Sequence, residues 1–265
     1  RGRKMFHLSN VAMIRDGRTI LSIDELRVPT DQLTVILGHN GSGKSTLVSL
    51  LSGQQAPDLG GVLLNNQSLA ALKSRELAKA VAFLPQKLPT SAGLTVRELV
   101  RLGRFAWRGT LGRWRSDDQT IIADAMQKTG VERFADTLAE QLSGGERQRA
   151  WVSMLLAQQA PVLILDEPTS ALDVHHQYHL MALLAELNHQ QGHGVIVILH
   201  DLNLAIRYAS HIIALKQGKV AFEGPADRVL DEKRLSDLYQ SNIRLIDHPH
   251  PIVHSKTNKL AVVCA

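Results

Sequence analysis

The sequence lacks the features of disulfide-stabilised and membrane-spanning proteins. Its one cysteine, Cys264, excludes an internal disulfide framework and fits a reducing compartment. Its longest apolar runs, such as residues 195–199, fall far short of the roughly 20 residues that cross a bilayer. Residues 6–10, which follow the basic start, are too few and too polar for the core of a secretory signal. We therefore expect the chain to stay in the compartment where it is made.

A strong charge of one sign is also absent. The chain carries 30 basic and 25 acidic residues, a net charge of +5, which is too mild to indicate a nucleic-acid partner. It has no internal repeat and no low-complexity segment. With 265 residues, 44% of them hydrophobic, it can bury one core or one core with an insertion.

Changes in hydrophobic periodicity divide the chain into regions. Residues 1 to about 30 alternate around an Asp16-Gly17 turn signal, which predicts an antiparallel sheet. Continuous apolar runs separated by helical stretches then predict parallel strands covered on both faces. These runs are residues 33–37, 81–84, 162–165 and 195–199. A helix after Asp201 and a hairpin turning at Gln217-Gly218 follow. The pattern predicts an α/β fold with a mostly parallel sheet, and residues 227–265 show no clear pattern.

A helical insertion is predicted for residues 87–141, where strand signals vanish. Thr95 with Glu98, and Ser116 with Gln119, have the spacing of capping boxes at helix starts. Four arginines then recur at steps that place them on one helical face: Arg97, Arg101, Arg104 and Arg108. That face is either a surface for a partner or anionic lipid, or a solvated face whose long stems cover apolar surface.

A phosphate-binding loop lies between the run at residues 33–37 and a helix ending near Gly53. Its pattern is glycine, four residues and Gly-Lys-Ser, in which glycines let backbone N–H groups converge on phosphate oxygens at a helix N-terminus. Lys44 is expected to reach the β and γ phosphates, and Ser45 to offer a hydroxyl to Mg²⁺. A chance glycine-rich turn is the alternative, against which the flanking strand and helix argue. The expected ATP-binding residues are Gly38, His39, Asn40, Gly41, Ser42, Gly43, Lys44, Ser45 and Thr46.

Three further strand ends carry polar residues that fit phosphate chemistry. Asp166 and Glu167 end a buried strand and point in different directions, so Asp166 can bind Mg²⁺ while Glu167 polarises the attacking water. His200 ends another strand and can donate to the γ-phosphate if the two strands are neighbours. Gln86 can contact Mg²⁺ or the water and report on the γ-phosphate to the insertion. Structural capping is the alternative for the carboxylates, and a structural histidine for His200.

A second anion-binding turn, Ser143-Gly144-Gly145-Glu146, opens a helix that runs to about residue 159. One nucleotide does not need two helix N-termini from distant points of one chain. The exception is a second turn that closes on the ATP of a neighbouring subunit.

The order of these motifs resembles the nucleotide-binding subunits of ATP-binding cassette (ABC) importers over nearly the whole chain. The resemblance implies a P-loop NTPase core from residues 1–86 and 142–265, with an antiparallel β subdomain. It implies a helical subdomain, residues 87–141, that contacts the membrane subunit. Glu167 would be the base and His200 the γ-phosphate sensor, with Ser45, Gln86 and Asp166 at the metal.

The same resemblance implies the assembly. Two copies would form a head-to-tail dimer on binding ATP and Mg²⁺, in which one chain completes the other's site through Ser143, Gly144, Gly145, Glu146 and Asp173. The cassette would be an ATP hydrolase of the translocase class, peripheral to the cytoplasmic face of the inner membrane. Membrane permease subunits and, indirectly, a substrate-binding protein would select the cargo.

Segments outside the ATP motifs narrow the resemblance to iron-siderophore importers: residues 94–104, 145–158 and 199–218. Residues 107–114 look most like cassettes serving ferric hydroxamates, with vitamin B12, haem and catecholate importers as relatives. Where many cassettes place an aromatic residue under adenine, this chain has Arg15, so either its guanidinium stacks on adenine or adenine is loosely held. Asp31-Gln32 replaces the glycine usual before the phosphate-loop strand.

Two other functions compete with import. A mechanical ATPase acting on ribosomes or DNA usually carries two cassettes or long coiled insertions, whereas this chain has one cassette with a compact insertion. A small-molecule kinase or GTPase built on the same loop would not need the turn at Ser143.

Overall fold

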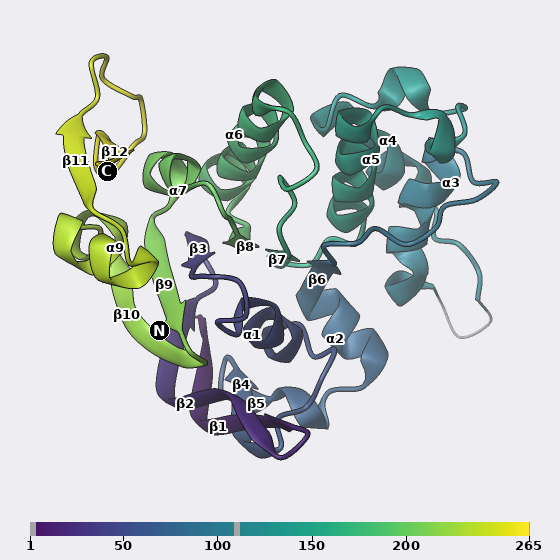
Figure 1. Ribbon diagram of the computed structural model, residues 1–265. Coiled ribbons are helices and arrows are strands. Elements are labelled where there is room, and N and C mark those ends of the chain that lie inside the picture. Colours follow the sequence, from purple (N-terminus) through teal and green to yellow (C-terminus); the bar gives the residue numbers. More distant parts are fainter. Residues whose placement is uncertain (1–3, 109–111, 265) are drawn as a thin grey trace.

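The computed structural model describes residues 4–108 and 112–264, and its centre is a six-stranded sheet with strand order β10-β9-β3-β8-β7-β6 (Figure 1). Four strand pairs are parallel, β6 with β7, β7 with β8, β8 with β3 and β3 with β9, and β10 is antiparallel to β9. The strands are β3 Leu33–Leu37, β6 Val81–Leu84, β7 Val162–Leu165, β8 Gly194–Ile198, β9 His211–Lys216 and β10 Lys219–Pro225. The predicted parallel core is confirmed.

Both faces of this sheet are covered, which explains its continuous apolar runs. In β3, Leu33, Val35 and Leu37 pack with helices α5, α6 and α7, while Ile36 points to the opposite face and packs with α1. Figure 1 shows α1 below the sheet and α6 and α7 above it. These helices are α1 Lys44–Leu51, α5 Gly144–Ala157, α6 Val174–Gln191 and α7 Leu202–Tyr208.

A second, antiparallel sheet with order β2-β1-β4-β5 covers α1 from the other side. Its strands are β1 Met5–Arg15, β2 Arg18–Pro29, β4 Leu59–Leu64 and β5 Gln67–Ser68. Asp16 and Gly17 both have positive φ, 49° and 72°, as a tight two-residue hairpin requires. The N-terminal antiparallel sheet was predicted, but its completion by β4 and β5 was not, and neither was helix α2, Ser74–Ala80.

The insertion is helical, and α5 packs against it. It contains α3 Val96–Arg101, the 3₁₀ segments η2 Leu102–Trp107, η3 Glu132–Phe134 and η4 Ala139–Gln141, and α4 Asp118–Lys128. Thr95 and Glu98 form the predicted capping box. The helix predicted to start at Ser116 forms, but its N-cap is Asp117, so the capping box predicted for Ser116 and Gln119 is wrong. The Asp118 carboxylate accepts from the backbone N–H of Arg115 at 2.7 Å and shapes the entry to the helix.

The predicted arginine face forms only in part, because Arg104 is buried while Arg97 and Arg101 stay exposed. Helix α3 ends at Arg101 and continues as η2, whose tighter winding breaks the alignment of the four side chains. Arg104 is fully buried and forms an ion pair with Asp118, with Nε 2.7 Å from Oδ1. Its Nη1 also donates to the carbonyl of Ala157, at the C-terminus of α5, at 2.8 Å. Arg104 therefore joins η2, α4 and α5, and neither a partner surface nor a solvated face describes it.

The C-terminal part consists of α8 Ala226–Val229, α9 Glu232–Tyr239 and a hairpin of β11 Ile243–Asp247 and β12 Lys259–Val263. It packs against α7 and β9 at the left of Figure 1. The predicted hairpin between β9 and β10 is confirmed, with positive φ at Gln217 and Gly218. Among the residues described, no helix is long and apolar enough to cross a membrane.

Candidate active site

The carboxyl ends of neighbouring strands bring three polar side chains together. Because β7 lies between β6 and β8, Glu167 after β7 meets Gln86 after β6 and His200 after β8. Gln86 Nε2 donates to Glu167 Oε2 at 2.6 Å, and His200 Nε2 lies 2.8 Å from Glu167 Oε1. Glu167 is 10% exposed in its side chain. One nearly buried carboxylate is thus held from two sides, as a positioned proton acceptor requires.

The two adjacent carboxylates have different partners. Asp166 Oδ1 accepts a hydrogen bond from Ser45 Oγ at 3.4 Å, whereas Glu167 contacts Gln86 and His200. Burial raises the pKa of Asp166, partly opposed by the hydrogen bond from Ser45. Glu167 has a left-handed backbone, φ 48°, a strained conformation that clusters at functional sites.

The phosphate loop is built as the sequence predicts. A Cβ at Gly38 would lie 2.4 Å from the carbonyl oxygen of Leu215, so only glycine fits there. Lys44 Nζ donates to the carbonyls of Gly38 and His39 at 2.7 and 2.8 Å. Burial lowers the pKa of Lys44, and the nearby carboxylates of Glu167 and Asp166 oppose that shift. Because a charged phosphate oxygen binds an ammonium group more strongly than a neutral carbonyl does, Lys44 can exchange these partners for phosphate oxygens.

A cavity of about 350 Å³ opens over this loop. Loop residues 40, 41 and 43–46 line it together with Ile20, from β2, and Glu167. The hydroxyl of Ser45, which lines the cavity, and the carboxylate of Asp166, to which it donates, are hard oxygen ligands of the type that Mg²⁺ prefers, so these residues fit the metal. The cavity therefore joins phosphate-binding backbone, a metal-binding pair and a candidate base.

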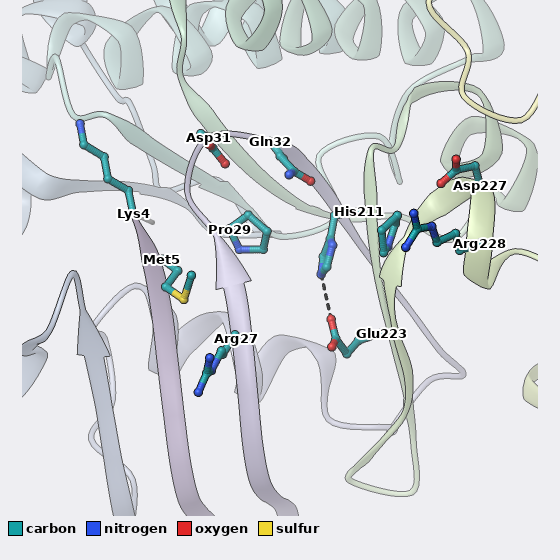
Figure 2. Close-up of a pocket in the computed structure, with 11 residues that line it drawn as sticks. Lys4, Met5, Arg27, Pro29, Asp31, Gln32, His211, Glu223, Asp227 and Arg228 are labelled. Carbon is teal, nitrogen blue, oxygen red and sulfur yellow. Dashed lines mark ion pairs between the residues drawn. The ribbon is translucent and has the colours of Figure 1, made fainter. Parts of the chain in front are cut away.

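A larger cavity, about 800 Å³, lies between the end of β2 and strands β9 and β10. Figure 2 shows His211, from β9, and Glu223, from β10, pointing toward each other in its lining, with Nε2 3.1 Å from Oε2. Burial lowers the pKa of His211, and Glu223 opposes the shift. Asp31 and Gln32 line the same cavity, and neither has positive φ, so their turn does not require the usual glycine. None of the residues with predicted phosphate roles lines this cavity.

Sequence reasoning missed Tyr239, which supports the phosphate loop from the C-terminal part. Its ring meets the ring of His39 edge-on, with centroids 5.6 Å apart. Burial raises the pKa of Tyr239 to about 12. Tyr239 lies in the tail, where the sequence shows no periodic pattern, so no signal could have placed it here. Ile20 was missed as well, because an apolar strand residue carries no sign of a cavity wall.

The turn at Ser143 is a capped helix N-terminus. Ser143 Oγ accepts from the N–H of Glu146 at 3.4 Å, and Glu146 Oε2 accepts from the N–H of Ser143 at 2.9 Å. Hydrogen bonding of the Glu146 carboxyl with the backbone N–H and the hydroxyl of Ser143 lowers its pKa. Ser143 and Gly144 are exposed, and none of residues 143–146, all of which the structure describes, lines the cavity over the phosphate loop. The turn therefore does not contribute to the cavity over the phosphate loop of its own chain.

Asp173 lies beside this turn rather than beside the phosphate loop. It caps α6, accepting from the N–H of His176 at 2.9 Å and from its ring Nδ1 at 2.7 Å. These bonds lower the pKa of Asp173. The ring of His176 occupies the space where Gly145 would carry a side chain. The structure therefore groups the candidate residues in two places, one around Lys44 and Glu167, and one around Ser143 and Asp173.

Arg15 is held outside the cavity. Its Nη1 pairs with Asp58 Oδ2 at 3.3 Å and its Nη2 donates to Gln55 Oε1 at 3.1 Å. It does not line the cavity over the phosphate loop, and its place beneath adenine stays a prediction. Of the stretch at residues 107–114, residues 109–111 lie outside the described part of the chain.

Relatives of known name align along most of the chain. The ferric enterobactin transport ATP-binding protein FepC of Escherichia coli is 41% identical over 84% of this chain and 83% of its own length. The iron(3+)-hydroxamate import ATP-binding protein FhuC of Bacillus subtilis is 38% identical over 91% of this chain and 88% of its own. The dimeric structure of a post-hydrolysis state of the cassette MJ0796, bound to ADP and Pi, is 31% identical with a TM-score of 0.74, covering 84% of this chain and 99% of that one.

The family described as "ABC transporter" matches residues 21–170, more than half of the chain. The match includes the phosphate loop, Gln86, the turn at Ser143 and the strand end at Asp166 and Glu167. The chain therefore belongs to the ABC transporter family, as an ATP-hydrolysing cassette.

Proposed function

We propose that this chain energises the import of iron(III) chelates, with ferric hydroxamates as the favoured cargo. The Glu167 carboxylate, held by Gln86 and His200 beside the phosphate loop, carries the ATPase role. FepC and FhuC, whose names give ferric enterobactin and iron(3+)-hydroxamate as cargo, support the class of chelate. Vitamin B12, haem and catecholate siderophores are the alternative cargoes.

In the proposed reaction, residues 38–46 bind the phosphates and Lys44 exchanges its carbonyl partners for β- and γ-phosphate oxygens. Glu167 accepts the proton of the attacking water as the water oxygen bonds to the γ-phosphorus and the bond to ADP breaks. His200 donates to a γ-phosphate oxygen. Ser45, Asp166 and Gln86 would hold Mg²⁺, which neutralises phosphate charge when bound. Arg15 would stack on adenine through the face of its guanidinium, while its N–H groups keep their contacts with Asp58 and Gln55.

A second copy of the chain would complete each site. Ser143, Gly144, Gly145, Glu146 and Asp173 would meet the nucleotide held by the partner's phosphate loop. Two observations support this: these residues are absent from the lining of their own chain's cavity, and the exposed turn is a helix N-terminus. The head-to-tail arrangement would therefore place two nucleotides between two chains.

The helical subdomain, residues 87–141, would contact the membrane permease subunits. A groove of about 730 Å³ between α3 and α4 supports this docking role. It combines Arg97 and Arg101 with the aromatic face of Trp114, over which the Arg101 guanidinium lies 3.9 Å from the ring centroid. We place the cassette at the cytoplasmic face of the inner membrane, with a substrate-binding protein supplying the cargo and no nucleic acid involved.

Reconstitution tests this proposal. The chain is co-purified with its hydrophobic subunits and placed in liposomes, and ATP hydrolysis is measured with binding protein loaded with ferric hydroxamate, ferric catecholate, haem or vitamin B12. We expect the ferric hydroxamate to stimulate hydrolysis most. A Glu167→Gln complex controls for contaminating ATPases. Stimulation by vitamin B12 alone would reject iron chelates as cargo, and recovery without any membrane subunit would reject import.

A further inference from the structure

His176, in the first turn of α6, contacts two of the groups that we propose face the partner chain, Asp173 and the turn at Ser143. His176 Nδ1 is 2.7 Å from Asp173 Oδ1, and the His176 ring lies directly over Gly145 at the start of α5. Residues 145 and 176 belong to different elements, the helix next to the insertion and the helix that follows β7. One imidazole therefore links the turn at Ser143 to Asp173.

The space at Gly145 explains why glycine stands there. A Cβ at Gly145 would lie 2.2 Å from Cδ2, 2.7 Å from Cγ and 2.8 Å from Nε2 of His176, closer than real Cβ atoms approach other groups. Rotating the ring away would break the contact between its Nδ1 and Asp173. Any side chain at residue 145 must displace the ring, break that bond, or shift the helix start.

The neighbouring residue, Gln177, secures the rest of this segment. Its Nε2 donates to the carbonyl of Leu172 at 2.9 Å and to that of Thr169 at 3.3 Å. Residues 169–173 begin two positions after Glu167. The segment therefore connects the proposed catalytic base of one nucleotide site to Asp173, which would meet the nucleotide bound by the partner chain. His176 extends this connection to the turn at Ser143.

We propose that His176 is a positioning residue that fixes the turn of residues 143–146 relative to the segment of residues 169–173, so that both meet the partner's nucleotide as one surface. The proposal rests on the shared site proposed above. His176 itself does not contact the nucleotide. It acts through Gly145 on one side and Asp173 on the other.

Two measurements distinguish this role from nucleotide binding by a single chain: ATP-dependent dimerisation and the ATP affinity of the isolated chain. In a Glu167→Gln background with Mg²⁺, we expect His176→Ala to raise the ATP concentration for half-maximal dimerisation roughly tenfold, within the usual range for coupled contacts. The ATP affinity of the isolated chain should be unchanged. His179→Ala, one turn further along α6, is the matched control and should dimerise like the parent. Dimerisation of His176→Ala at parental ATP concentrations would overturn the proposal, and so would an equal loss of single-chain affinity.

A compensating pair tests the contact itself. Gly145→Ala should impair dimerisation because its Cβ collides with the ring and because residue 145 itself would meet the nucleotide. If the collision contributes, Gly145→Ala combined with His176→Ala should lose less than the two single variants lose together. Losses that simply add would show that residue 145 is not constrained by His176 and would overturn the proposal. If the shared site itself is wrong, the Glu167→Gln parent fails to dimerise with ATP, which distinguishes the two failures.

Discussion

The Glu167 carboxylate accepts from an amide on one side and an imidazole on the other, which keeps it fixed toward the phosphate loop. Replacement by Gln keeps the shape but removes the basic oxygen. We expect Glu167→Gln to lower ATP turnover by roughly 10²–10⁴-fold, the usual contribution of a positioned base, while ATP binding persists. Turnover and nucleotide affinity are measured separately on the same preparation.

Lys44→Ala is the matched comparison, because it removes a cation facing the phosphates and should weaken binding itself. Near-normal turnover in Glu167→Gln would remove this residue from the base role. Unchanged affinity in Lys44→Ala would count against the phosphate-loop assignment.

His193 makes stability depend on pH. Burial lowers its pKa below the ordinary value of 6.5, and the hydrogen bond to the carbonyl of Ala160 opposes this only partly. Between the lowered and the ordinary pKa the unfolded chain binds more protons than the folded one. The stabilisation is therefore complete above about pH 6.5 and is lost as the pH falls through that value.

We expect His193→Gln to flatten the fall in urea midpoint between about pH 7 and pH 5. His250→Gln, on the exposed tail, removes an imidazole that unfolding does not newly expose and serves as control. A His193→Gln curve parallel to that of the wild type across this range would contradict the burial argument.

Among the elements, the insertion and α5 depend on one buried ion pair. Arg104 and Asp118 are 0% and 4% exposed in their side chains. Removing one partner of a buried pair leaves an uncompensated charge, at a cost of about 3–5 kcal/mol. We expect Arg104→Met to lower the free energy of unfolding by about this amount, measured by urea denaturation.

The double variant Arg104→Met with Asp118→Asn measures how much of this cost comes from leaving the Asp118 charge buried without a partner. The amide oxygen of Asn can still accept from the N–H of Arg115, as Asp118 does at 2.7 Å, but leaves no buried charge. We expect it to be more stable than Arg104→Met alone. Equal stability of the two would mean that Arg104 acts through its bonds to Ala157 and Gln159 instead.

The same region marks where sequence reasoning fails. Steps of four, three and four are compatible with one α-helical face, but they cannot reveal that the helix tightens after Arg101. The partners of Arg104 come from α4 and from the end of α5, and no periodic signal joins these distant positions. By contrast, residues 33–37 and 162–165 were predictable as strands, because strands covered on both faces are apolar at every position.

The active site likewise contains residues that the sequence predicts and contacts that it does not. Asp166, Glu167 and His200 were predictable because each lies within two residues of the end of a buried strand, and parallel strands end at one edge of a sheet. The contact between Gly145 and His176 was not, because it depends on how two helices pack rather than on spacing within either. Tyr239 was missed for the same reason.

At the scale of the whole molecule, residues 4–108 and 112–264 contain one phosphate loop but two helix starts that we propose bind phosphate, at Gly43 and at Ser143. The second start does not contribute to the cavity of the first. If the helix start at Ser143 of each chain contacts the nucleotide of a neighbouring chain, both helix starts bind phosphate. Mixed dimers can test this arrangement.

One subunit carries Lys44→Ala and the other Ser143→Arg, whose bulky cation should obstruct the phosphate that Ser143 would otherwise meet. Both carry Glu167→Gln to retain ATP, and different tags allow mixed dimers to be purified. Ser143→Arg also removes a capping side chain from α5, at a cost of about 1 kcal/mol, so the folded state of each homodimer is checked by its urea midpoint.

If the sites are shared, both lesions of the mixed dimer fall in one site. The other site then combines an intact Lys44 with an intact Ser143 from opposite chains, and one nucleotide should be retained per mixed dimer. If each chain instead builds its own site, both sites of the mixed dimer are damaged and nucleotide retention matches the poor homodimers. Verified mixed dimers that retain no more ATP than either homodimer would reject the head-to-tail arrangement, because no other pairing of intact halves remains.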